Sequence, residues 1–135
     1  MSLFQLEKDI QVLCVTADSF PNGIAAAFQK VHALVPNSNE RKTFGISYAN
    51  QAGDIIYKAA VSGKDENEAE TLGLETFIIK RGTYISTIIH NYMQATSAIG
   101  EAFSQMLNDP RIDPQGACIE WYINDKEVQC MVRLE

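Results

Sequence analysis

A single carboxylate lies in the middle of an otherwise apolar strand that the sequence predicts. The segment 118–123 has the sequence Cys-Ile-Glu-Trp-Tyr-Ile, and alternation along a strand puts Glu120 and Tyr122 on the same face. A buried carboxylate has to be hydrogen-bonded, paired with a cation or kept neutral by a raised pKa. One that faces a cavity can attract a cationic ligand or act as a general base. The alternative is that Glu120 is exposed to solvent or paired with Arg133 or Lys58.

Aromatic residues near this carboxylate could form the walls of a binding site. Tyr122 is expected on the face of Glu120, Trp121 on the opposite face, and Tyr48 in the matching strand of the first half of the chain. Aromatic faces around one carboxylate can bind a cation or a flat ring. A shift of one residue in strand register would exchange Trp121 for Tyr122, so both remain candidates.

Two histidines are weaker candidates. His90 stands beside Asn91 before the second predicted helix, where it could lie at the rim of a pocket or simply bond to backbone. His32 lies on the first predicted helix and is expected at or near the surface. No H-x-x-x-H, H-E-x-x-H, G-x-S-x-G, Walker or G-x-G-x-x-G pattern occurs. Metalloprotease, serine hydrolase and nucleotide-binding interpretations therefore lose their support.

The three cysteines do not indicate a metal site or a disulfide framework. The number of cysteines is odd, and no two of Cys14, Cys118 and Cys130 form a C-x-x-C pair. We expect three reduced thiols in strands, behaving as small apolar side chains. No metal and no cofactor are predicted.

Composition limits the class of protein. The 135 residues, 46% hydrophobic and 21% charged, are expected to form one globular domain, 1–135. The net charge of −6 argues against direct nucleic acid binding. No apolar run approaches the roughly 20 residues of a membrane span, and residues 1–9 have no signal-peptide pattern. We therefore expect no membrane association and a cytoplasmic location.

The predicted elements fall into two similar halves, 10–62 and 74–134, joined by an acidic linker at 63–73 that is expected to stay hydrated. Each half has the order strand, helix, strand, strand. The first half is predicted to contain strands at 10–15, 43–50 and 55–62 and a helix at 24–34. The second is predicted to contain a β-rich run at 74–89 broken at Gly82, a helix that Asn91 could cap, and strands at 117–123 and 128–134.

The two predicted helices also share residues. Residues 24–28, Ile-Ala-Ala-Ala-Phe, align with residues 99–103, Ile-Gly-Glu-Ala-Phe, at a separation of 75 positions. Three of the five positions are identical. Together with the repeated order of elements, this favours an internal duplication.

Several short motifs resemble one known family. They are the run 73–84, Gly-Leu-Glu-Thr-Phe-Ile-Ile-Lys-Arg-Gly-Thr-Tyr, the residues 88–91 with the helix that follows at 95–107, the closing strand and turn 119–125, and the first-half strand 44–48. This pattern is similar to the gyrase-inhibitory-protein-like family, also known as the effector-binding domain of bacterial transcription activators. The resemblance covers about residues 10–134. Asn91-Tyr92-Met93 departs from the family's Gly-Pro-Tyr before the second helix, and Trp121 replaces a smaller apolar residue.

The resemblance implies a fold and a site. The family's fold is α+β: a duplicated β-α-β-β unit with pseudo-twofold symmetry, an antiparallel sheet with helices on one face, and a ligand cleft between the halves. The family's cleft glutamate corresponds to Glu120, and its tyrosines to Tyr122 and Tyr48. Members bind varied, often hydrophobic and cationic, small molecules, and many are fused to a DNA-binding domain that this sequence lacks.

Three functions follow as hypotheses. The first is a stand-alone domain that binds a small organic molecule at Glu120, Tyr122, Tyr48, Trp121 and His90, as a regulator or as a sensor or sequestering protein for foreign compounds. The second is a hydrolase of reactive small molecules in which Glu120 is the general acid or base. The third is an inhibitor that binds a protein partner through its acidic surface.

Overall fold

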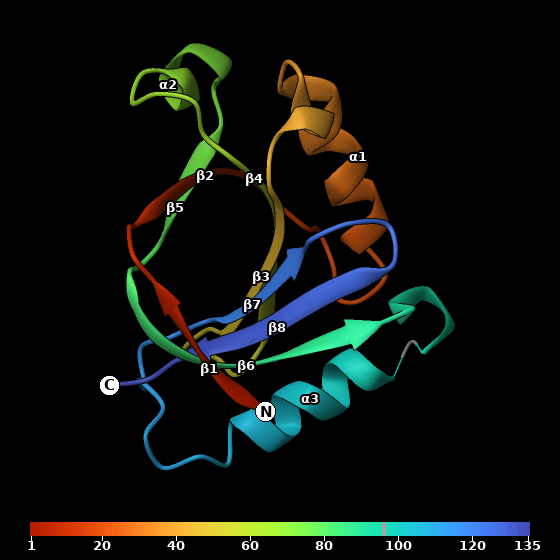
Figure 1. Cartoon of the computed structure of the whole chain (residues 1–135). Helices are drawn as coiled ribbons and strands as arrows, with labels where there is room; N and C mark the ends of the chain where they lie inside the picture. The colour runs from red at the N-terminus through yellow and green to blue at the C-terminus, as the bar shows by residue number, and fades with distance from the viewer. Residues whose placement is uncertain (96) are drawn as a thin grey trace.

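The computed structural model describes residues 1–95 and 97–135, as an α+β fold (Figure 1). The strands are β1 (Ser2–Leu6), β2 (Ile10–Thr16), β3 (Thr43–Ala49), β4 (Ile55–Ser62), β5 (Glu75–Ile79), β6 (Gly82–His90), β7 (Cys118–Tyr122) and β8 (Glu127–Arg133). The helices are α1 (Ile24–Leu34), α2 (Glu68–Leu72) and α3 (Ala98–Met106), with 3-10 turns η1 (Ser38–Glu40) and η2 (Tyr92–Gln94). No helix in the described part of the chain has the length and hydropathy that a membrane span needs.

All eight strands form one curved antiparallel sheet in the order β1-β6-β8-β7-β3-β4-β2-β5. The order is symmetric about the β3–β7 pair, and each half contributes one β-α-β-β unit, β2-α1-β3-β4 or β6-α3-β7-β8. Each of the two remaining strands pairs with the unit of the other half. Strand β1 precedes the first unit but pairs with β6, and β5 precedes the second unit but pairs with β2. The duplicated fold with pseudo-twofold symmetry is confirmed.

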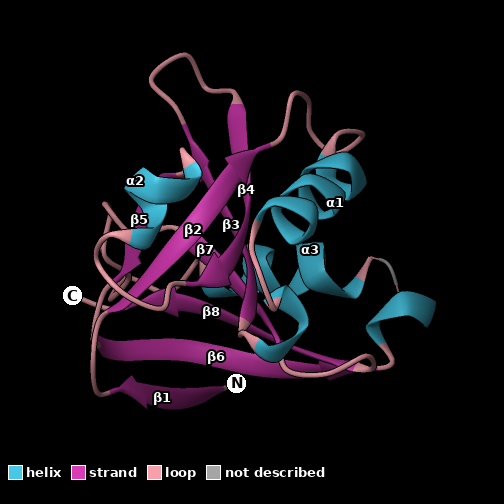
Figure 2. Cartoon of the chain, turned by 90° about the horizontal axis from the view of Figure 1, so that it is seen from above, coloured by secondary structure: helices cyan, strands magenta, loops and turns pink. Residues whose placement is uncertain are grey.

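The two longer helices cover the outer face of the curved sheet (Figures 1 and 2). Alternation in the strands supplies an apolar surface for each of them. Ala27 and Val31 of α1 pack with Leu13, Ala59 and Val61. The corresponding cluster under α3 contains Ala102, Phe103, Met106, Val128, Cys130 and Val132. The prediction of helices on one face is correct for α1 and α3.

The inner face of the sheet carries its own apolar core. Its buried members are Val12, Cys14, Phe44, Ile46, Ala60, Ile79, Tyr84, Ile119 and Met131. Aromatic side chains, among them Phe4, Tyr48, Phe77 and Trp121, pack against this cluster. The middle strands are therefore apolar on both faces, which explains why Glu120 stands out in the sequence.

Three local features differ from the sequence-based predictions. Strand β1 was not predicted, because its pairing with β6 is a contact across 80 positions that no local pattern reveals. The segment 63–73, predicted as a hydrated linker, contains α2, whose Ala69 is buried. Asn91 does not cap the second long helix. It has φ 54° and precedes η2, while α3 begins at Ala98. Residue 96, inside the predicted helix, lies outside the described residues.

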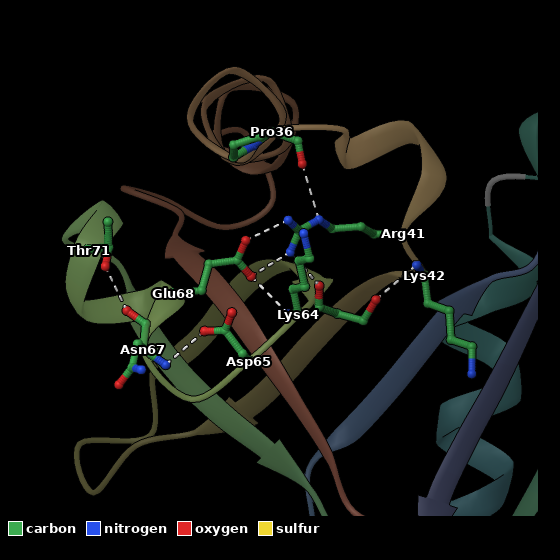
Figure 3. A network of polar contacts seen from close by, with 9 residues as sticks. Pro36, Arg41, Lys42, Lys64, Asp65, Asn67, Glu68 and Thr71 are labelled. Carbon is green, nitrogen blue, oxygen red and sulfur yellow. Dashed lines mark hydrogen bonds and ion pairs between the residues drawn. The ribbon is translucent and has the colours of Figure 1, made fainter.

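An ion pair fixes α2 to the body of the domain (Figure 3). The guanidinium of Arg41 donates from both Nη atoms to the two carboxylate oxygens of Glu68, each at 2.6 Å. It also donates to the backbone carbonyls of Pro36 and Ser62. Both charged side chains retain only 12% of their exposure. The paired guanidinium lowers the pKa of Glu68 to about 2, so this part of the acidic segment is a structural anchor.

We expect Glu68→Gln to destabilise the protein by about 1–2 kcal/mol at neutral pH, the scale of charge-assisted hydrogen bonds. The folded-state pKa of Glu68 lies below its ordinary value of 4.5. Its contribution to stability is therefore complete above the ordinary pKa and is lost as the pH falls toward 2. Chemical denaturation of parent and variant from pH 7 to pH 2 checks this.

Glu70→Gln is the matched control, since Glu70 lies on the same short helix with an exposed side chain. It should change stability little at any pH. A stability difference between parent and Glu68→Gln that stays constant from pH 7 to pH 2 would contradict the role of this ion pair.

Candidate functional site

Glu120 lies at the centre of the outer sheet face, directly opposite Gly45 of the neighbouring strand β3. It retains 8% of its exposure. Its oxygen Oε1 accepts hydrogen bonds from the hydroxyl of Tyr57 at 2.9 Å and from that of Tyr122 at 2.5 Å. Strand β3 thus contributes a glycine to the surroundings of this carboxylate, and β4 contributes a tyrosine.

The second oxygen, Oε2, accepts no hydrogen bond from the described residues. No fully buried side-chain polar atom in this part of the chain lacks a partner. Oε2 therefore keeps some contact with solvent, although the residue as a whole is buried. The carboxylate has one oxygen held by the protein and one left for an external donor or cation.

Gly45 is required by the contact between Tyr57 and Glu120. A Cβ at this position would lie 2.0 Å from the Tyr57 hydroxyl oxygen and 2.7 Å from Glu120 Oε1. The tyrosine side chain occupies the space that any other residue would fill. Gly45 and Glu120 are also 75 positions apart, the separation that relates the two helices, so the duplication places them at equivalent positions facing each other. The site thus lies at the pseudo-twofold axis.

Burial dominates the electrostatics of this cluster. It raises the pKa of Glu120, while the hydrogen bonds from Tyr122 and Tyr57 act in the opposite direction. Burial, reinforced by the charge of Glu120, raises the pKa values of Tyr57 and Tyr122 well above the ordinary value of 10. Both tyrosines therefore stay protonated and remain donors to the carboxylate at physiological pH.

Glu120 is not neutralised by a basic side chain among the described residues. Lys58 pairs with Glu75 at 2.8 Å, and Arg133 pairs with Asp113 at 3.2 Å. The alternative of an exposed Glu120, or one paired with Lys58 or Arg133, is therefore wrong. When Glu120 is ionised, its charge is balanced only by hydroxyl dipoles.

Aromatic rings from both halves cover the tyrosine–glutamate cluster. Phe28 of α1 contacts Tyr122 and Tyr57 edge-on, with ring centroids 5.8 and 6.1 Å apart. Tyr92 of η2 approaches Tyr122 edge-on at 5.4 Å. Phe20 stacks on Tyr57 at 6.0 Å. The two tyrosines that donate to Glu120 are therefore surrounded by an aromatic surface with rings from both halves.

A cavity of about 550 Å³ opens over this surface between the two halves. Tyr122 lines the cavity, whereas Glu120 and Tyr57 lie behind it and are not lining residues. The first half contributes Ile24, Phe28, His32, Asn39, Arg41 and Thr43, and the second contributes Tyr92, Tyr122, Ile123, Asn124 and Asp125. The cavity combines an aromatic wall with a polar rim, as small-molecule sites commonly do.

Two predicted site residues lie on the other side of the sheet. Tyr48 stacks on Phe77 at 6.5 Å, and Trp121 packs against Phe44 at 5.9 Å. Both belong to the inner face, so the structure does not bring them together with Glu120 and Tyr122. The register of β7 is the one that the alternation favoured, with Tyr122 rather than Trp121 beside the glutamate.

His90 is also separate from the carboxylate. Its side chain keeps 71% of its exposure, and its Nδ1 lies 2.7 Å from Oε2 of Glu127. It borders a different polar hollow with Asn91 and Asn124.

Sequence reasoning missed Tyr57, Phe28 and Tyr92. For Tyr57 a signal existed, since alternation in strand 55–62 puts it on one face with Ala59 and Val61, but only the register shows that this face meets Glu120.

The described residues contain no group of three or more His, Cys, Asp or Glu side chains positioned to hold a metal ion. Burial raises the pKa of Cys118 to about 11 and that of Cys130 to about 12, so neither thiol near the site is an activated nucleophile. The titratable groups in direct contact at the buried carboxylate are Glu120 itself, Tyr57 and Tyr122.

Solved structures share this fold at low sequence identity. An integron cassette protein from the mobile metagenome of Vibrio cholerae superposes with a TM-score of 0.70 and 12% identity, covering 99% of this chain and 95% of that one. The protein SAV2435 bound to tetraphenylphosphonium gives 0.65 and 14%, covering 98% and 93%. A hydrolase from Listeria innocua gives 0.63 and 11%, covering 99% and 90%.

No family model matches the chain, and neither does any curated protein. The likeness to the solved structures therefore shows the fold alone. It agrees with the gyrase-inhibitory-protein-like fold that the sequence motifs suggest. One protein of this fold binds a small organic cation.

A double-mutant cycle tests the role of Gly45. Gly45→Ala should destabilise the protein by about 3 kcal/mol, because the added methyl overlaps the Tyr57 hydroxyl. Tyr57→Phe should cost about 1 kcal/mol for the lost hydrogen bond. The double variant should be less destabilised than the sum by about 1 kcal/mol, since the closest overlapping atom is gone. Chemical denaturation gives all three values.

Gly100→Ala is the control for the glycine substitution. A Cβ at Gly100 meets nothing within 4 Å on helix α3, so alanine should stabilise the protein by up to about 1 kcal/mol. Strictly additive effects of Gly45→Ala and Tyr57→Phe would show that the two residues do not share the space described.

Proposed function

We propose that this protein binds a small, lipophilic organic cation in the cavity between its halves, with Glu120 as the source of negative charge. The observation that carries the proposal is the state of this carboxylate. It is buried, held at one oxygen by two tyrosine hydroxyls, and without a basic partner among the described residues. Such a group is prepared for a cation that comes from outside the chain.

The energetics favour a cation over a neutral ligand. Burial disfavours the ionised form of Glu120, and a cation nearby compensates for part of that cost. The attraction is stronger than in water because the effective dielectric constant is lower at this depth. Rings such as Tyr122 and Phe28 add cation–π contacts of about 0.5–2 kcal/mol each.

The shape of the cavity supports a ligand with large apolar groups. Its volume of about 550 Å³ is within the usual range for drug-sized molecules. The aromatic wall buries apolar surface without demanding one exact shape, so the protein should accept cations of varied structure. Tetraphenylphosphonium bound to a protein of the same fold supports this ligand class. The biological role we propose is regulation, sensing or sequestration of such compounds.

Titration calorimetry with tetraphenylphosphonium tests the proposal. We expect the parent to bind it, and Glu120→Gln to bind it at least tenfold more weakly because the variant keeps the size and an acceptor oxygen but loses the charge. The neutral compound triphenylphosphine oxide should bind parent and variant equally. Tyr48→Ala, on the inner face, should leave cation binding unchanged.

Three outcomes would count against this proposal. Absence of cation binding to a folded parent would refute it, and equal cation affinity in parent and Glu120→Gln would remove the role of the carboxylate. Loss of binding in Tyr48→Ala with a normally folded variant would move the site to the inner face.

A hydrolase is the second candidate, favoured by the raised pKa of Glu120 and by the free oxygen Oε2. A carboxyl group with a raised pKa can serve as a general acid or base near neutral pH. This function requires Oε2 to reach the reacting atom of a bound substrate. Glu120→Gln distinguishes it from simple binding, because turnover of an uncharged reactive substrate would disappear while its binding persisted.

A further inference from the structure

His32 forms part of the cavity wall. It lies in the last turn of α1, and its ring stacks on Phe28 with centroids 6.5 Å apart and an angle of 23° between the planes. Phe28 in turn contacts Tyr122. His32 and Tyr122 therefore line the same cavity on either side of one phenyl ring.

The end of α1 places the hydroxyl of Ser38 against both the carbonyl and the imidazole of His32. The carbonyl of His32 would normally accept from the backbone N–H four residues later, but residue 36 is proline and has no N–H. The hydroxyl of Ser38 donates to this carbonyl instead, at 3.3 Å. Ser38 has a single hydroxyl hydrogen, and it is used in this bond.

The donor and acceptor roles in the contact between Ser38 and the imidazole then depend on that bond. His32 Nδ1 lies 2.9 Å from Ser38 Oγ. With the hydroxyl hydrogen directed at the carbonyl, both contacts form together only if Nδ1 carries a hydrogen and donates it to Oγ. A neutral imidazole with its hydrogen on Nδ1 has a lone pair on Nε2.

Nε2 is available to a ligand. It makes no hydrogen bond to the described residues, and it is not among the buried polar atoms that lack a partner, so it is accessible. Nδ1 faces Ser38, which is outside the cavity lining, and Nε2 is on the other side of a ring that lines the cavity. The imidazole thus adds a neutral acceptor to the cavity wall, which also contains Asn39, Asn124 and Asp125.

We infer that the natural ligand is a protonated aromatic amine with at least one N–H, which His32 Nε2 accepts, and that a quaternary cation of the same skeleton is recognised less well. This inference rests on the proposed cation binding and specifies the chemical class of the ligand. The aromatic wall takes the ring system, Glu120 provides the charge, and His32 selects for the N–H group. A ligand that covers Nε2 with methyl groups leaves its lone pair without a donor, and this costs binding free energy.

A matched pair of ligands tests this selectivity. The probes are 1-naphthylmethylammonium and its N,N,N-trimethyl derivative, measured by calorimetry at pH 8. The variant His32→Phe keeps an aromatic ring beside Phe28 and removes the acceptor. We expect the affinity ratio of amine to quaternary cation to fall about tenfold from parent to His32→Phe, the scale of one hydrogen bond to a charged donor.

His90→Phe is the control, since His90 is the other histidine and lies outside this cavity; it should leave the ratio unchanged. A ratio that is the same in parent and His32→Phe overturns the inference. If the quaternary cation still binds and depends on Glu120 in that case, the proposed function stands alone. If neither probe binds the parent, both fail.

Imidazole ¹⁵N shifts provide a readout that needs no ligand. In the parent, His32 should show a protonated Nδ1 and an unprotonated Nε2, and Ser38→Ala should shift it toward a mixture of tautomers. A parent with the hydrogen on Nε2 would overturn the inference. Addition of the amine should move the Nε2 resonance in the direction of an accepted hydrogen bond.

Discussion

A carboxylate buried in the middle of a sheet has to be solvated by the protein, and the structure around Glu120 is arranged by that requirement. The hydroxyls of Tyr57 and Tyr122 replace water at one oxygen. Tyr57 reaches across β3 only because Gly45 leaves the space for it. Burial still raises the pKa of Glu120 despite both hydrogen bonds, so the solvation is incomplete and a cation would improve it.

The duplication places this incompletely solvated carboxylate between the two halves of the fold. Gly45 and Glu120 occupy equivalent positions in the two halves and face each other in the β3–β7 pair. Two glutamates there would repel each other and leave no space for Tyr57, so the asymmetry between glycine and glutamate is what makes the site stable. The cavity above it is bounded by α1 of one half and η2 of the other. The proposed cation binding therefore depends on the two halves having diverged.

Much of the fold could be predicted from local patterns. Strand 55–62 and helix 24–34 have the predicted bounds, and the alternation in 118–123 correctly places Glu120 beside Tyr122. Pairing between strands that are distant in the sequence could not be predicted from local patterns, which is why β1 and the contact of Tyr57 with Glu120 were missed. Tyr48 was assigned by its position in a matching strand, but its alternation puts it on the inner face with Phe77.

The acidic segment shows a different limit. Its composition predicts hydration, and for most of its charges the structure agrees, but Glu68 is bound by Arg41 from a strand-flanking segment 27 positions earlier. Charge composition alone cannot show which carboxylate has a partner. Likewise the contacts of Ser38 with the carbonyl and the imidazole of His32 are visible only after the chain has folded.

The pKa of Glu120, measured by ¹³C NMR of its side-chain carboxyl with and without saturating tetraphenylphosphonium, tests the central claim most directly. A cation that binds the ionised carboxylate must lower its pKa, because proton and cation binding are linked. We predict a raised pKa in the free protein that falls on saturation. A pKa that is unchanged or higher in the saturated protein would show that the cation binds without using this carboxylate.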